Sequence, residues 1–488
     1  MFVRICGRAG AALVMICSAS VTFAQDTAQT HDMSAMTRGG SGTSWLPDAS
    51  PMYMLHVQRG AWMLMTHENA FLQFVSDSGR RGDDQVGSVN WLMTMANRNV
   101  GQGRLSLRAM FSGEPWTIRG CGYPDMLASG EECRGETIHD RQHPHDLPME
   151  ISAEYDAPIR GDLRWQLYGG PSAEPALGPV AYPHRVSAMP NPIAPISHHW
   201  LDSTHVSFGV VTGGVYGKRW KAETSLFNGR EPDDNRKDFD FGALDSVSGR
   251  VWFMPTPNVA LQVSAGRLTE AEAGEGSEPR RDVERVTASV TFHRVSTGRV
   301  AASTFAWGRN VELAHATNAL LLETNLTLND RDTWFGRLEV VQKTAHDLEV
   351  VATQDRFAVS KIQGGYTRYI RATGSFKAGL GAAASAAIVP GELAPVYGRR
   401  VNPGVAVFLT LRPAMMSIAA QTAGGGQTMI MVQTAYDPAK LTCEAGFDPR
   451  TAASTTYDGR TYYFCSAADR DKFLTDPKMS LSMMPPKQ

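Results

Sequence analysis

The sequence is short of several features that would assign it to a common class of protein. Lys and Arg number 47 against 49 Asp and Glu, so the chain lacks the basic excess of nucleic-acid-binding proteins. No apolar run approaches about 18 residues, the length that a transmembrane helix needs. The sequence also lacks Gly-x-Ser-x-Gly, phosphate-loop and His-Glu-x-x-His motifs. These absences argue against nucleic-acid binding, against a helical membrane protein and against the commonest hydrolases and NTPases.

Cysteine is also scarce, with six residues among 488. The first 24 residues have the layout of a signal peptide, because Arg4 and Arg8 flank an apolar run that ends at the small residue Ala24. We therefore expect residues 1–24 to be removed and the mature chain to be exported. Cysteines in an oxidising compartment commonly form disulfides, although they can instead bind metal. Export leaves two sequence-local pairs, Cys121 with Cys133 and Cys443 with Cys465.

Most of the chain, from about residue 52 to 412, alternates apolar and polar residues with a period of two. In TWFGRLEVV, for example, Trp334 and Leu338 share one face. Arg337 and Glu339 share the other face. The same alternation recurs in VERVTASVTFHR, NVALQVSAG and GVAVFLTLRP. This region is therefore predicted to consist of β-strands with one apolar and one polar face.

Short and long connections alternate between these strands. Tight turns at one end and longer loops at the other are typical of a transmembrane β-barrel. The count predicts about 16 antiparallel strands, an even number that places both termini in the periplasm. A soluble sandwich or propeller would not need this alternation, and no fixed repeat of about 40–50 residues indicates a propeller. The expected short links are 157–161, 216–218, 255–258, 295–298, 329–332 and 372–375, and the long ones are 113–147, 169–202, 228–244, 269–282, 309–315, 343–355 and 390–402.

The predicted fold is therefore an all-β outer-membrane barrel followed by a small C-terminal α+β domain. A barrel of this size can enclose an aqueous lumen. Inward residues such as Arg337, Glu339 and His293 are then expected to face water. The Gly- and Ser-rich stretch before the barrel is expected to be flexible. The expected boundaries are 1–24 for the signal peptide, 25–51 for the flexible N-terminal segment, 52–413 for the barrel, 414–430 for a linker and 431–480 for the C-terminal domain.

Histidines are concentrated in two successive long connections, in the stretches TIHDRQHPHDLP and PHRVSAMPNPIAPISHHWLDSTH. Imidazole binds Cu(II), Zn(II) or Ni(II), and a site needs three or four ligands that folding brings together. The alternative is that these histidines cap loops and form local hydrogen bonds. The expected metal ligands are His139, His143, His145, His198 and His199, with His184 and His205 close by.

Methionine is frequent, with 22 residues, and part of it is clustered. Thioethers favour Cu(I), but methionine is also common in protein cores and on lipid-facing surfaces. Composition alone therefore leaves the copper interpretation open. The clusters are Met52, Met54, Met63 and Met65, then Met479, Met483 and Met484.

One stretch has the residue types of a hydrolase. Asp202, Ser203 and His205 are close in sequence, but a triad requires that their side chains point at one another. We expect no enzyme activity and keep an outer-membrane hydrolase as a third hypothesis.

The region after a Gly-rich connector reads VQTAYDPAKLTCEAGFDPRTAASTTYDGRTYYFCSAADRDKFLTDP. On these residues the tail resembles the YHS family, a small metal-associated domain. The resemblance implies a short β-hairpin and a following helix, with Cys443 and Cys465 as ligands for copper or another soft metal. A disulfide between these two cysteines is the open alternative. The matching residues are Asp437, Pro438, Cys443, Asp448, Pro449, Tyr457, Gly459, Tyr462, Tyr463, Phe464, Cys465, Ser466, Phe473, Asp476 and Pro477.

Together these patterns predict an outer-membrane channel or conduit with a periplasmic YHS-like domain, and copper is the metal that we expect first. The loop histidines would lie at the outer mouth. The alternative is a non-transporting envelope protein that buffers or senses metal. Expected partners are the lipid bilayer and a metal ion or small solute, without nucleic acid; the oligomeric state stays open, with a trimer as one option. The barrel also resembles a group of exported barrels that share HDRQHPHD and SHHWLDSTH segments, which implies architecture rather than an activity.

Overall fold

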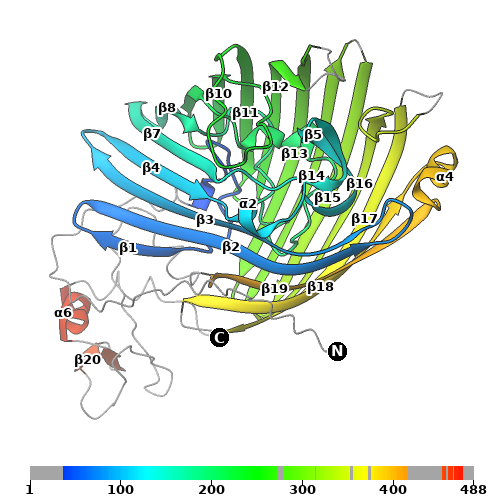
Figure 1. Cartoon of the computed structure of the whole chain (residues 1–488). Helices are drawn as coiled ribbons and strands as arrows, with labels where there is room; N and C mark the ends of the chain where they lie inside the picture. Colours follow the sequence, from blue (N-terminus) through cyan, green and yellow to red (C-terminus); the bar gives the residue numbers. More distant parts are fainter. Residues whose placement is uncertain are drawn as a thin grey trace, which may run out of the picture.

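The described part of the chain contains a closed antiparallel β-barrel of sixteen strands, as predicted (Figure 1). Each barrel strand pairs with the next barrel strand along the chain, so that β4 pairs with β7. The barrel closes where β19 pairs with β2, from Gly404 opposite Asp77 to Leu411 opposite Ala70. The computed structural model describes residues 37–272, 279–313, 315–351, 356–371, 375–415, 453–457, 460–464 and 467–475.

The barrel strands have lengths from seven residues in β9 to 17 residues in β3. A further short strand, β1 (Leu55–Arg59), forms a hairpin with the start of β2. The barrel strands are β2 (Trp62–Asp77), β3 (Asp84–Val100), β4 (Gly103–Phe111), β7 (Pro148–Arg160), β8 (Leu163–Ser172), β9 (Val210–Tyr216), β10 (Trp220–Phe227), β11 (Ser246–Thr256), β12 (Val259–Glu272), β13 (Arg281–Ser296), β14 (Arg299–Glu312), β15 (His315–Leu328), β16 (Asp332–Thr344), β17 (Arg356–Arg371), β18 (Phe376–Ile388) and β19 (Val401–Pro413).

The alternation in the sequence separates an outer from an inner face. Trp334 and Leu338 are 55% and 43% exposed on the outside, whereas Arg337 and Glu339 are buried on the inside. Large apolar side chains are exposed on the outer face of most other strands as well. An outward apolar band on a closed barrel is the surface that a lipid bilayer covers. Of the helices in the described residues, none is long and apolar enough to cross a membrane.

Three of the long connections contain secondary structure of their own. Inner loop A, residues 112–147, holds the short helix α2 (Glu114–Thr117) and a hairpin of β5 (Tyr123–Cys133) and β6 (Glu136–Gln142). A disulfide joins Cys121 to Cys133 and ties this hairpin, which confirms the pairing expected there.

Inner loop B, residues 173–209, is mostly irregular. It holds α3 (His198–Leu201) and the 3₁₀ turn η1 (Ser203–His205). A third long connection, residues 389–400, contains η2 (Gly391–Leu393) and α4 (Ala394–Tyr397).

The expected aqueous environment of the inward residues is wrong, because inner loop B packs against them. Arg337 donates a 2.7 Å hydrogen bond to the Ile193 carbonyl. Glu339 accepts hydrogen bonds from the backbone and hydroxyl of Ser197 at 3.0 and 2.7 Å. His293, also predicted to face water, is fully buried. Inner loop B therefore fills the lumen at this level. The polar groups of a buried loop need hydrogen-bond partners, and the polar inner face of the wall supplies them.

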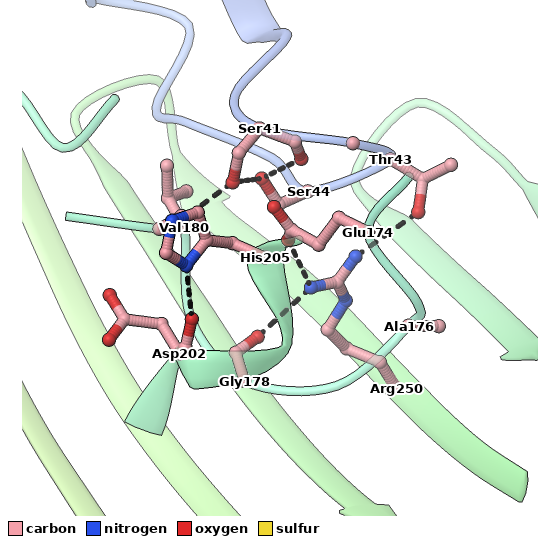
Figure 2. Close-up of polar contacts among 12 residues, drawn as sticks. Ser41, Thr43, Ser44, Glu174, Ala176, Gly178, Val180, Asp202, His205 and Arg250 are labelled. Carbon is pink, nitrogen blue, oxygen red and sulfur yellow. Dashed lines mark hydrogen bonds and ion pairs between the residues drawn. The ribbon is translucent and has the colours of Figure 1, made fainter. Parts of the chain in front are cut away.

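The expected flexibility of residues 25–51 is also wrong for residues 37–51. Figure 2 shows this segment against inner loop B and the wall: Ser41 accepts a hydrogen bond from the backbone beside Val180, and Thr43 accepts one from Arg250. Both serine and threonine are buried. Residues 1–36, with the expected signal peptide, lie outside the described residues.

The C-terminal region contains a hairpin of β20 (Ala453–Tyr457) and β21 (Arg460–Phe464), followed by helix α6 (Ala467–Thr475). Tyr462, Phe464 and Phe473 form its small core. A short hairpin and a following helix were expected in this part of the chain. Cys443 and Cys465 lie outside the described residues, as do most of the linker and residues 476–488.

A candidate metal site between the inner loops

Inner loop B is almost wholly buried inside the barrel, and its backbone approaches the wall closely. Gly178 adopts φ +84°, and a Cβ there would lie 2.1 Å from the Leu201 carbonyl oxygen. Only glycine fits such a close, left-handed position. Pro195 precedes the helical turn α3, whose His198 backbone nitrogen donates to the Pro195 carbonyl at 3.1 Å. The loop is thus held in one path that carries His198 and its neighbours inward.

A buried ion network anchors inner loop B to the wall. Arg185 donates to Asp202 of the same loop and to Glu323 of β15, both at 2.6 Å. Glu323 also accepts a 3.2 Å hydrogen bond from Arg337 of β16. The side chains of these four residues are at most 2% exposed. Buried charges need such pairing, because loss of one partner leaves an uncompensated charge.

Five histidine rings from the two inner loops lie close together, and we call them the histidine cluster. His198 is central: its ring centroid is 5.1 Å from that of His205 and 5.4 Å from that of His199. The His143 ring lies 6.1 Å from His198. The His145 ring lies 5.3 Å from His205. Inner loop A supplies His143 and His145, and inner loop B supplies the other three.

Hydrogen bonds orient His143, His198 and His205 through Nδ1, whereas His199 Nδ1 lies near a carboxylate but has no hydrogen-bond partner among the described residues. His198 Nδ1 is 2.8 Å from an Asp202 carboxylate oxygen, and His205 Nδ1 is 2.9 Å from the Asp202 carbonyl. His199 Nδ1 lies 2.9 Å from Glu231. His143 Nδ1 lies 3.2 Å from the carbonyl of the next residue. Histidines that bind metal are commonly held in this way by their second nitrogen.

The Nε2 atoms, on the opposite side of the rings, are the atoms that indicate a metal site. Nε2 of His143, His199 and His205 is buried and has no hydrogen-bond partner in the part of the chain that the structure describes. A buried polar atom without a partner is costly, and a metal ion would satisfy it. His199, with Glu231 and Glu272, also offers three ligand atoms within 4.8 Å of one another.

Burial keeps most of the cluster in the neutral, ligand-competent form. Desolvation lowers the pKa of His199 to about 4 and lowers the pKa of His143 and His205 well below the usual value. The pKa of His198 is lowered by the same cause. Neutral imidazole is the form that binds metal.

His145 differs from the other four. Its Nδ1 is 2.9 Å from Glu114, and its Nε2 is 3.0 Å from the Tyr182 hydroxyl. Burial alone would lower the pKa of His145, but the Glu114 carboxylate raises it above its usual value. Both ring nitrogens are occupied, so His145 fits an orienting role better than a ligand role.

The structure thus brings together His143, His145, His198 and His199 of the predicted ligands. His139 does not join them: its ring is 3.0 Å from Asp140 and its side chain is 38% exposed. The cluster is buried between the inner loops, near the end of the wall where the long connections emerge: Asn310 donates to the His199 carbonyl at 3.1 Å, and Trp200 donates to Thr317 at 2.8 Å.

Two partners of the cluster have no signal in the sequence. Glu131 lies 3.2 Å from His143, and Glu231 comes from the connection after β10. Their roles depend on contacts between distant segments. His205 was near enough in sequence to be suspected, but as a base beside Ser203 rather than as a ligand.

The hydrolase arrangement is not formed. Ser203 Oγ accepts a 2.9 Å hydrogen bond from Arg285. The Asp202 carboxylate instead contacts His198 and Arg185. Among the described residues, Ser203 has no hydrogen bond to His205, so no nucleophile is activated there.

Comparisons with known proteins match the barrel alone. Solved structures similar to this chain include Salmonella typhi OmpF in complex with daunomycin, with a TM-score of 0.44 and 8% identity over 73% of this chain and 100% of that chain. An anion-selective porin from Comamonas acidovorans has a TM-score of 0.44 and 8% identity over 72% and 99%. The outer membrane channel DcaP of Acinetobacter baumannii has a TM-score of 0.39 and 8% identity over 73% and 98%. No family model and no curated protein matches the chain.

The buried ion network predicts how inner loop B can be released. Arg185→Leu should destabilise the docked loop by about 3–5 kcal/mol, because Asp202 and Glu323 would remain buried without their partner. Hydrogen exchange of residues 176–205 should rise sharply while the barrel strands stay protected. Arg230→Leu, which removes a surface pair with Glu270, is the matched control and should leave exchange unchanged. Equal exchange in both variants would contradict the anchoring role.

Proposed function

We propose that the protein is an outer-membrane barrel that binds a transition-metal ion within its lumen through the histidine cluster. The observation that carries this proposal is the gathering of the His143, His198, His199 and His205 rings, three of which (His143, His199 and His205) bury an Nε2 atom without a hydrogen-bond partner among the described residues. A donor set of imidazole nitrogens, with the Glu231 and Glu272 carboxylates beside His199, suits Cu(II), Ni(II) or Zn(II). Cu(II) should bind most tightly of the three, because it stands highest in the Irving–Williams order.

The barrel would act as a metal conduit that is closed at rest. Long connections of such barrels face outward and short turns face the periplasm, so an ion entering from outside would meet the inner loops first. Porin-like barrels move solutes through the lumen, and a site there would select metal from other solutes. Passage requires that inner loop B shifts from its anchored position.

A non-transporting metal buffer is the second candidate function. It is favoured by the dense packing of inner loop B, where Arg185, Ser197 and Leu201 are fully buried. A loop of this stability could hold metal without letting it pass.

We also propose that the C-terminal region is a periplasmic YHS-like domain that binds Cu(I) through Cys443 and Cys465. Support comes from the residues shared with that family and from the hairpin and helix of residues 453–475. Thiolate ligands favour Cu(I).

The histidine cluster is tested by Cu(II) titration of the purified full chain in detergent. We use a background with Cys443→Ser and Cys465→Ser, so that tail thiols neither bind nor reduce the metal. His143→Gln with His205→Gln should weaken Cu(II) binding by at least roughly 100-fold, because two ligands are lost. His139→Gln, outside the cluster, should leave the affinity unchanged. Nitrogen hyperfine structure in the electron paramagnetic resonance spectrum should vanish with the double variant; its survival would contradict the site.

Transport is tested in proteoliposomes that contain a copper-quenched dye. A conduit predicts Cu(II) entry that the paired His143→Gln and His205→Gln substitutions abolish, together with a potassium chloride conductance far below that of an open porin. The reason is that ions must pass the packed inner loops. Protein that binds Cu(II) but never quenches the dye would replace the conduit with the buffer.

The tail is tested by counting Cu(I) ions bound to the reduced full chain. Cys443→Ser with Cys465→Ser should lower the count by one, since both thiolates would be lost together. His139→Gln serves again as the unaffected control. An unchanged count, with no free thiol before reduction, would show the pair to be a structural disulfide.

A further inference from the structure

A second group of soft donors lies outside the histidine cluster, on the inner faces of β2, β3 and β4. His67 stands directly opposite Met93, and Met93 stands opposite Met110. One row across three neighbouring strands therefore presents imidazole, thioether and thioether into the lumen. The adjacent row places Met65 opposite Met95. Over the rest of the wall the inward side chains are largely Arg, Lys, Glu, Asn, Gln, Ser and Thr.

The ligating atoms of this row are already close. His67 Nε2 is 3.0 Å from Met93 Sδ, and His184 Nε2 is 3.4 Å from Met110 Sδ. The rings of His67 and His184 are 5.4 Å apart. A tetrahedral metal with nitrogen and sulfur ligands at roughly 2.0 and 2.3 Å holds these atoms about 3.5 Å apart. Small side-chain shifts would therefore bring each of the two nitrogen–sulfur pairs to the spacing of ligands around one metal ion.

Inner loop B supplies the fourth donor. His184 follows a tight turn in which its backbone nitrogen donates 2.9 Å to the Ala181 carbonyl, and its ring packs against Trp91 at 4.9 Å. The next residue along the chain is Arg185. Its ion pair with Asp202 therefore also fixes the position of His184.

A cavity of about 110 Å³ is lined by three of these four donors, His67, Met93 and His184, and can admit an ion. Further thioethers line it, so that a bound ion would meet soft atoms on several sides. The methionines lining the cavity are Met52, Met54, Met65, Met93, Met95 and Met189.

Two nearby cations need to be accounted for, and the first, Arg104, is paired with Asp156 at 3.1 Å. Arg108 lines the same cavity and would repel a metal ion if it were unpaired. Its guanidinium is 2.6 Å from Glu154 and 3.8 Å from Glu150, so its charge is compensated.

We propose that His67, His184, Met93 and Met110 form a binding site for Cu(I), separate from the histidine cluster. Thioether sulfur selects soft monovalent copper over Zn(II) and Ni(II), whereas the histidine cluster offers nitrogen and oxygen. Methionine also fills irregular cores, but here each of the two sulfurs lies within hydrogen-bonding distance of an imidazole Nε2 atom, so that nitrogen and sulfur donors stand side by side. The site goes beyond the proposed function and does not depend on it.

The experiment measures Cu(I) affinity of the full chain under anoxic conditions, by competition with bicinchoninate. The background again carries Cys443→Ser and Cys465→Ser. Met93→Leu with Met110→Leu removes the sulfurs and keeps the volume, so the fold should persist. Cu(I) binding should weaken by at least about 100-fold, because two of four ligands are lost. Met149→Leu is the matched control: Met149 is buried in the same apolar cluster, whereas the two imidazole–sulfur contacts are made by Met93 and Met110.

Two readouts separate this site from the histidine cluster. His143→Gln with His205→Gln should leave Cu(I) affinity intact, while the paired methionine variant should leave Cu(II) affinity intact. X-ray absorption at the copper edge of the Cu(I)-loaded background protein should show sulfur scatterers, a signature that does not depend on any variant at the site. Only nitrogen and oxygen scatterers, or an unchanged Cu(I) affinity in the methionine variant, would overturn the proposal.

Discussion

The pairing of Arg185 with Asp202 and Glu323 is the interaction on which the interior depends. It joins inner loop B to the wall across 138 residues of sequence. Inside a barrel, a buried charge without a partner costs several kcal/mol. Loss of the arginine would therefore destabilise the packing of inner loop B against the wall. Asp202 in turn orients His198 and His205, and the residue before Arg185 is His184. Anchoring and donor placement therefore have one physical cause.

With these segments inserted, the described part of the lumen is a packed interior and not an aqueous pore. Arg337, Glu339 and His293 would be ordinary lining residues of an aqueous pore, but here they satisfy the backbone and side chains of inserted segments. The interior becomes a packed protein core with polar walls, in which ring nitrogens and thioethers can be held at fixed positions. Two donor environments result, one of nitrogen and oxygen between the inner loops and one of nitrogen and sulfur on β2 to β4.

Much of the wall could be predicted because period-two alternation is local. Trp334 faces out and Arg337 faces in whatever the rest of the chain does. Successive long connections emerge at the same end of a barrel, so four of the five predicted ligand histidines do meet. His139 fails because Asp140 and Arg81 hold its ring elsewhere. That competition between partners cannot be read from residue spacing.

The sequence by itself determined the strands, their two faces, the closed barrel that they imply, the nearness of Cys121 to Cys133, and which two connections carry histidine. These features follow from residues near one another in the chain. That this cysteine pair forms a disulfide was decided by the structure. Only the tertiary structure decided that residues 37–51 and inner loop B fill the lumen, that Glu131 and Glu231 face the histidines, and that His67, Met93 and Met110 share a row. Strand register and buried ion pairs join residues far apart in sequence, and their energies depend on burial that exists only after the chain has folded.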